Sequence, residues 1–235
     1  MRIASLGLVL LLFAVKPAIA VDPETAARQF KSTLSKAEIT ATFKAYTDGD
    51  RTAYRLTPGQ RGGLALRNMK AETRAAALTF LRAFFSPRGM AVIQGVFDRE
   101  ARLAVIEEEP DYRHPELYYL AVFGEPGGGR WGFRFEGHHL SLNLSLDGGT
   151  LTAITPVLLG ANPKEGPSAG PDPLAAFLSN HENAPAFLNE VAKMFRDKER
   201  AALLLKGAEL ETGGFGVWGH PHMEVTGPLD FGQQR

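Results

Sequence analysis

The sequence predicts a single α+β domain: N-terminal helices, then a central antiparallel β-meander with a bulged middle strand, then C-terminal helices. Three observations predict this class. Apolar residues recur at helical spacing over residues 22–109, aromatic and aliphatic runs separated by Gly-rich turns occupy residues 117–159, and further helix caps follow from residue 172. The domain is expected to cover residues 21–235, with an atypical, Gly-rich tail over 208–235.

The composition narrows the class of protein further. The chain has 235 residues, with 26 Lys and Arg against 26 Asp and Glu, and 44% of its residues are hydrophobic. High apolar content without net charge argues against disorder. The balanced charge gives no basic surface for a nucleic acid, and the lack of Cys excludes disulfides and thiolate metal ligands.

Residues 1–20 are typical of a cleaved signal peptide. Arg2 provides the positive start, residues 3–15 are almost wholly apolar, and a small-x-small pattern ends at Ala20. The apolar run is shorter than the roughly 20 residues that span a bilayer. We therefore expect cleavage after Ala20 and a periplasmic or extracellular protein with no membrane segment after cleavage; the alternative is an uncleaved N-terminal anchor.

The first half of the mature chain reads as helical. Asp22-Pro23 is an N-cap followed by Pro at the first helical position, and residues 35–38 match a capping box. Gly and Pro make residues 42–66 irregular. Residues 70–85 form an Ala- and Leu-rich helix, and Ser86-Pro87 begins another that reaches about residue 109.

Three strands are expected next, over residues 117–123, 131–146 and 150–159, joined by Gly-rich turns. Helices follow from Asp172-Pro173 to about residue 180, over residues 186–195, and from Asp197 to Gly207. A short strand is expected near residues 223–225.

In the predicted middle strand, residues 131–146, the apolar residues change from odd-numbered to even-numbered positions. Aromatic residues occupy odd positions from Trp131 to Phe135, whereas leucines occupy even positions from Leu140 to Leu146. Because side chains alternate with period two, one extra residue near Gly137 would bring both sets to one face, and Gly is common at β-bulges. The opposite face then carries a stripe of polar side chains: Arg134, Glu136, His139, Ser141 and Asn143.

This polar stripe predicts the candidate site. Glu136, His139 and Arg134 are candidate catalytic residues, and Ser141 and Asn143 are candidates for binding an unknown small molecule. A transition metal (Zn, Cu or Fe) is a candidate cofactor, since imidazoles suit all three. Its candidate ligands are the four histidines of two clusters: His138, His139, His220 and His222. The alternative is a structural role, with His138 a hydrogen-bonded core residue and the second cluster a solvated loop.

The letters of two catalytic motifs occur in the sequence, but not in the structural context that each motif requires. Residues 166–170 fit G-x-S-x-G, but no strand precedes them and prolines flank the Ser. Residues 127–132 fit G-x-G-x-x-G, but they join two strands rather than a strand and a helix. Neither motif supports a nucleophile elbow or a dinucleotide site.

Several runs resemble the domain-of-unknown-function 3500 family over roughly residues 30–175. The most specific spans Trp131 to Asn143 (WGFRFEGHHLSLN), and the others are YRLTPGQRGGL with Asn68-Met69, PELYY, FGEP, Thr155-Pro156 and LGANP. The resemblance implies an exported protein without an assigned activity, in which Arg134, Glu136, His138, His139 and Asn143 belong to a shared pattern. A later His run typical of the family does not follow residue 228, so we expect a C-terminally shortened member.

The sequence leaves two functions open. The first is an exported enzyme with a metal-bound His/Glu site on the central sheet. The second is a non-catalytic exported module that binds a small ligand or a partner. Whether the chain is an enzyme, its substrate and its oligomeric state are not readable from the sequence.

Overall fold

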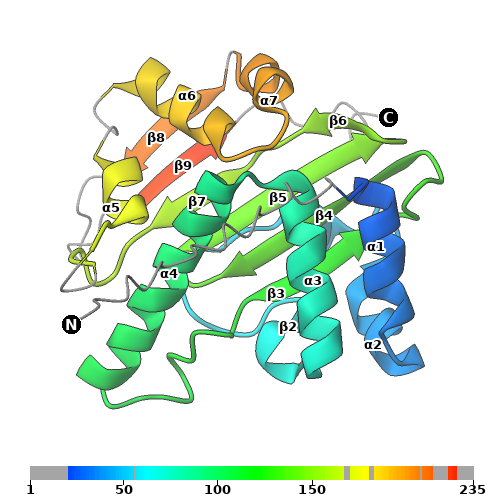
Figure 1. Ribbon diagram of the computed structural model, residues 1–235, viewed down its shortest axis with the longest axis horizontal. Coiled ribbons are helices and arrows are strands. Elements are labelled where there is room, and N and C mark those ends of the chain that lie inside the picture. Colours follow the sequence, from blue (N-terminus) through cyan, green and yellow to red (C-terminus); the bar gives the residue numbers. More distant parts are fainter. Residues whose placement is uncertain are drawn as a thin grey trace, which may run out of the picture.

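The structure is a computed structural model that describes residues 21–55, 57–166, 170–179, 183–206, 208–213 and 222–226, the backbone alone for 209–213 and 222–226. It confirms the α+β class, with helices flanking a mixed sheet (Figure 1). The expected signal peptide, His220 and the Ser of the G-x-S-x-G match lie outside the described residues. No helix within the described ranges is long and apolar enough to cross a membrane.

Four helices precede the long strands, and the predicted caps begin three of them. Asp22 accepts a hydrogen bond from the Thr25 amide, Ser35 and Glu38 form a capping box, and Ser86 accepts from Gly89. The four helices are α1 (Pro23–Ser32), α2 (Lys36–Thr42), α3 (Ala71–Phe84) and α4 (Pro87–Ile106).

The region predicted to be irregular, residues 42–66, contributes two short strands and two 3-10 turns. The strands are β1 (Phe43–Lys44) and β2 (Leu64–Ala65), and the turns are η1 (Gly49–Thr52) and η2 (Leu66–Asn68). β1 pairs in parallel with the strand β3 (Tyr119–Phe123), whereas β2 pairs antiparallel with it. Their shortness and the Gly and Pro residues between them gave no period that could be read from the sequence.

The long strands form the predicted meander and continue into a wider sheet. Its order is β1-β3-β4-β5-β7-β9-β8, and β6 also pairs with β5. The predicted third strand is two strands on either side of Pro156, which has no amide hydrogen for the ladder. The remaining strands are β4 (Arg130–Gly137), β5 (Leu140–Asp147), β6 (Thr150–Ala153), β7 (Val157–Gly160), β8 (Glu209–Gly213) and β9 (His222–Thr226).

Three short helices follow the meander, as predicted, with Asp172, Asn183 and Asp197 as side-chain N-caps. They are α5 (Pro173–Leu178), α6 (Ala184–Lys193) and α7 (Lys198–Leu204).

The predicted bulge near Gly137 is wrong. β4 and β5 pair in unbroken register from Arg130 with Asp147 to Gly137 with Leu140, and His138 and His139 form a two-residue turn between them. His139 adopts a positive φ of 57°. The turn explains the change of phase, because residues paired across antiparallel strands share a face. The predicted assignment of residues to the two faces therefore holds for both strands, although the cause differs.

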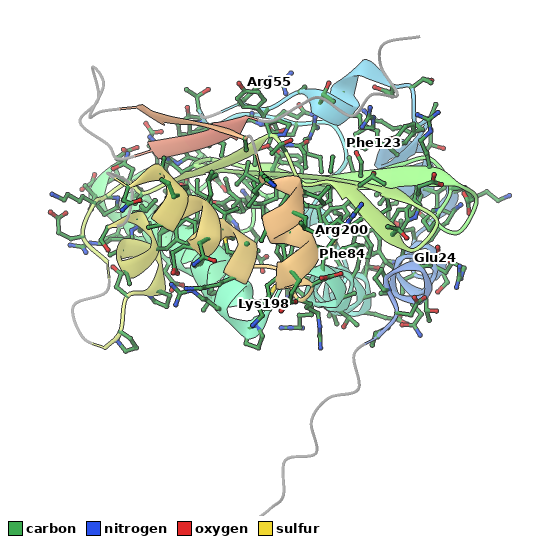
Figure 2. All side chains as sticks on the ribbon, turned by 90° about the horizontal axis from the view of Figure 1, so that it is seen from above. Glu24, Arg55, Phe84, Phe123, Lys198 and Arg200 are labelled. Atoms are coloured by element: carbon green, nitrogen blue, oxygen red, sulfur yellow. The ribbon has the colours of Figure 1, made fainter. Side chains whose placement is uncertain are left out.

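The apolar face of the hairpin packs against the helices. The rings of Phe133 and Phe80 lie 4.8 Å apart, and those of Phe84 and Trp131 lie 6.2 Å apart. Figure 2 shows the sheet nearly edge-on, with α3, α4 and the C-terminal helices on one side and Arg55 on the other. The two faces of the sheet are thus covered in different ways, by helices on one and by the irregular segment 46–63 on the other.

Gly137 is the position in the hairpin where a side chain has least room. A Cβ there would lie 2.3 Å from Cδ1 of Tyr118, a fully buried ring, and 2.8 Å from the carbonyl oxygen of Leu117. We expect Gly137→Ala to lower the free energy of unfolding by about 1–3 kcal/mol, measured by urea denaturation. Gly49→Ala is the control, because Gly49 has open space and ordinary φ; an equal loss in both variants would contradict this account.

Candidate functional site

The polar stripe predicted on β4 and β5 lies on one face of the sheet but does not meet water. Arg134 is paired with Asn143, and Glu136 with Ser141, and all four are buried. The irregular segment 46–63 lies over this face and supplies most of the partners of the stripe. Buried charged side chains need ion-pair or hydrogen-bond partners, because an unpaired charge inside the protein is strongly unfavourable.

Arg134 is held by the backbone and one carboxylate of that segment. Its Nη1 lies 2.9 Å from Asp50 Oδ1 and its Nη2 lies 3.0 Å from Asp50 Oδ2, which is a bidentate pair. Nη2 also donates to the carbonyl of Gly62 at 3.3 Å. Burial works to raise the pKa of Asp50, but hydrogen bonds from Arg134 and Lys44 outweigh it and lower the pKa to about 2.

Glu136 is surrounded by positive groups. Arg134 Nε lies 3.0 Å from its Oε2 as an ion pair, Arg61 Nε lies 3.5 Å from its Oε1, and the amide of Arg55 donates to Oε1 at 2.6 Å. Burial raises the pKa of Glu136, although the neighbouring arginines oppose the shift. A carboxylate whose oxygens face two guanidinium groups does not fit the role of a ligand to a metal cation.

The other members of the stripe are also engaged internally. Asn143 Nδ2 donates to Ser141 Oγ at 3.2 Å and to the carbonyl of Pro156 at 3.0 Å. Arg51, from η1, donates to Ser145 Oγ at 3.0 Å. The contact of Arg51 ties the segment 46–63 to the sheet. The predicted ligand-binding role of Ser141 and Asn143 stays a prediction.

A second buried cluster lies at the turn between β4 and β5. Oε2 of Glu100, on α4, is 2.5 Å from Nδ1 of His138, and both side chains are less than a tenth exposed. The carboxyl and the imidazole therefore form a hydrogen-bonded pair. Arg113 Nη1 is 3.4 Å from the same Nδ1 and 3.9 Å from Glu100 Oε1.

The environment of Glu100 changes its acidity. Burial raises the pKa of this carboxyl from 4.5 to about 7, although Arg113 acts in the opposite direction. Glu100 was not predicted as a site residue. The available signal was its position on the apolar stripe of its helix, three to four residues from Val96 and Leu103, where a carboxylate calls for a specific partner.

A small pocket opens beside the Glu100–His138 pair. Tyr118 lies against it and donates its hydroxyl to the carbonyl oxygen of His138 at 3.1 Å, which fixes the turn. Burial raises the pKa of Tyr118 well above its ordinary value, so the phenol remains a neutral donor. The hollow has space for about one water molecule. It is lined by Pro58, Gly59, Glu100, Tyr112, His114, Leu117, Tyr118 and His138.

The predicted histidine set is brought together only in part. The rings of His138 and His139 lie 4.1 Å apart. His222 is in β9 beside Gly160, whose amide donates to the carbonyl of His139, so their backbones are separated by one strand. Across the described residues, no three His, Asp or Glu side chains are grouped as a metal ion requires. A metal bound with His220 or His222 stays a prediction.

Asp50→Asn tests the bidentate pair between Asp50 and Arg134, which we call the clamp. At pH 7 we expect it to lower the free energy of unfolding by about 2–3 kcal/mol, because the guanidinium loses its bidentate partner and keeps only the ion pair with Glu136. Asp50 has a lower pKa in the folded state, so its contribution is present above pH 3.8 and is lost as pH falls towards 2. The difference between wild type and variant should therefore shrink by about 2 kcal/mol between pH 5 and pH 2.

The control for this measurement is Asp98→Asn, an exposed carboxylate on α4. It should behave like wild type in urea denaturation at every pH. A difference between Asp50→Asn and wild type that does not change with pH would contradict the ionic account of the clamp.

The chain was compared with protein families, curated proteins and solved structures. The family model described as "Protein of unknown function (DUF3500)" matches residues 18–216. No curated protein and no solved structure matches the chain. The matched range includes both buried clusters and all the strands up to β8.

Proposed function

The chain belongs to the DUF3500 family of proteins of unknown function, and from its site we propose that it is an exported enzyme whose Glu100–His138 pair performs acid–base catalysis on a small molecule. The observation that carries this proposal is the buried 2.5 Å contact between Glu100 Oε2 and His138 Nδ1 at the wall of a pocket. A carboxylate that fixes an imidazole in one orientation is a recurrent arrangement in proton-transfer sites.

Acid–base catalysis needs a group that titrates near neutral pH and a ring nitrogen held in a fixed orientation, and the pair supplies both. The pKa of Glu100, about 7, allows it to hold or release a proton near neutral pH. Because Nδ1 of His138 faces Glu100, proton exchange with a bound molecule would pass through Nε2 of the same ring. The neutral Tyr118 hydroxyl and Arg113 hold the turn and the carboxylate in place.

The size of the pocket favours hydrolysis over other proton transfers. Space for about one water molecule lies beside the pair, walled by Pro58, Gly59 and Tyr112. A water there would give its proton to His138 as its oxygen attacks a substrate carbonyl or phosphoryl centre, and the leaving group would then accept that proton. The substrate would bind outside the pocket, against the side chains that line its mouth.

Export rests on residues 1–20 alone, whose pattern is that of a signal peptide. The expected mature protein begins at Val21, two residues before α1 starts at Pro23. Intact-mass measurement of the protein recovered from the export compartment of a bacterial host should give the mass of residues 21–235. Retention of residues 1–20 on the recovered protein would contradict cleavage.

Catalysis is tested with purified protein on a panel of small esters, amides and phosphoesters. We expect turnover of at least one class, and a fall in kcat/KM of about 100-fold or more in His138→Gln and Glu100→Gln, as is usual when a general base is lost. Asp98→Asn is the matched control, because Asp98 is an exposed carboxylate on the same helix that accepts from Gln94 Nε2 at 2.8 Å. Turnover that persists in both site variants would assign the reaction to other residues.

The shifted acidity of Glu100 also predicts how stability depends on pH. A carboxyl with a higher pKa in the folded state holds its proton while the unfolded chain releases it, so stability falls as pH rises from 4.5 to about 7. The fall should reach up to about 3 kcal/mol. Glu100→Gln should remove this decline and Asp98→Asn should keep it, measured by urea denaturation at several pH values; a decline that Glu100→Gln leaves intact would contradict the shift.

A non-catalytic exported module that binds a small molecule is the second candidate. It is favoured by the polar stripe of the sheet, whose charged groups are neutralised within the protein rather than presented to a substrate. Failure to turn over any class of the panel, together with wild-type stability, would favour this reading.

A further inference from the structure

A second cavity lies at the opposite end of the β4–β5 hairpin from the Glu100–His138 pair. It opens beside the β5–β6 turn and measures about 340 Å³, within the usual range for small-molecule sites. The length of β5, eight residues at about 3.3 Å each, separates the two ends by about 25 Å. The residues that line it include Ala83, Phe84, Leu146, Phe195, Arg196 and Arg200.

The floor of this cavity is apolar and closely packed. Ala83, Phe84, Leu146 and Phe195 are all less than a tenth exposed, although they line an open space. The ring of Phe84 lies edge-on to Trp131 at 6.2 Å. The floor therefore continues the hydrophobic core of the sheet and suits an aliphatic or aromatic group.

The rim is charged, and its two arginines outnumber its one carboxylate. Arg200 Nε donates to the carbonyl of Leu151 at 2.8 Å, and Arg196 Nη1 donates to the carbonyl of Arg82 at 3.0 Å. Each guanidinium is thus anchored to backbone by one nitrogen. The carboxylate of Asp197 accepts from the amide of Arg200 as the cap of α7. Figure 2 shows Arg200 and Phe84 on the helical side of the sheet, away from Arg55.

We propose that this cavity is a binding site for a small carboxylate with an apolar body, whose carboxylate pairs with Arg200 and Arg196 while its tail covers Phe84. Guanidinium groups pair with carboxylates in a fork geometry, and those that are already anchored lose less side-chain freedom on binding. The site is independent of the proposed catalytic pair.

Octanoate is the probe, with 1-octanol as its uncharged counterpart and acetate as its tail-less counterpart. By calorimetry on residues 21–235, octanoate should bind with a Kd below about 1 mM, and acetate at least tenfold more weakly. Arg200→Gln should weaken octanoate about tenfold and leave 1-octanol within twofold. Arg102→Gln, whose guanidinium contacts the carbonyls of Glu165 and Gly166, should change neither.

Two further variants keep the test decisive if Arg200→Gln is unstable. Ala83→Met fills the floor and should abolish binding of both octanoate and 1-octanol, whereas Arg196→Gln should weaken octanoate alone. In a Trp218→Phe background, octanoate should also change the emission of Trp131, which contacts the floor through Phe84.

The outcomes that overturn the proposal are specific. Undetectable octanoate binding at 10 mM, equal loss of octanoate and 1-octanol in the arginine variants, or unchanged octanoate binding in Ala83→Met would each exclude this site. Glu100→Gln should bind octanoate like wild type, so the proposed catalysis and this site can fail separately.

Discussion

The register of the β4–β5 hairpin decides what each face of the sheet can do. A two-residue turn at His138 and His139 places Phe133 opposite Leu144 and Arg134 opposite Asn143. One face is therefore wholly apolar and the other carries charged side chains, because paired residues point the same way. A slip by one residue would put Arg134 among the aromatic rings. The apolar core and the Asp50–Arg134 pair therefore specify the same register.

Burying charge on the second face gives the irregular segment a definite path. Residues 46–63 have few apolar side chains to bury, yet they cross the sheet in one arrangement because Asp50, Arg51 and Arg61 each have a partner on it. Arg61 faces Glu136 through Nε and donates to the carbonyl of Gly59 through Nη1. Gly59 in turn forms part of the pocket wall. Glu136 thus reaches the pocket wall only through Arg61.

The sequence predicted the structure correctly where the signal lay within a single helix or hairpin. Helix caps at Asp22, Ser35 and Ser86 and the division of the hairpin into two faces could be read from local spacing. The turn was missed because Gly-His-His-Leu lacks the usual Asn-Gly or Asp-Gly signal. The partner of His138 was missed for a different reason: Glu100 is 38 residues away on a helix, and only the packing of α4 against the sheet brings the two together.

Two carboxyl groups of the same protein, one half-buried and one buried, show how neighbouring groups set acidity. Asp50 is held by a guanidinium and an ammonium group, and its pKa falls to about 2, so it is a permanent anion suited to holding structure. Glu100 is more deeply buried beside an imidazole, with Arg113 at 3.9 Å, and burial raises its pKa to about 7. Carboxyls whose environments push their acidities apart take different roles. By this criterion, the proposed proton exchange is placed at Glu100 and His138, whereas Asp50 holds the irregular segment on the sheet.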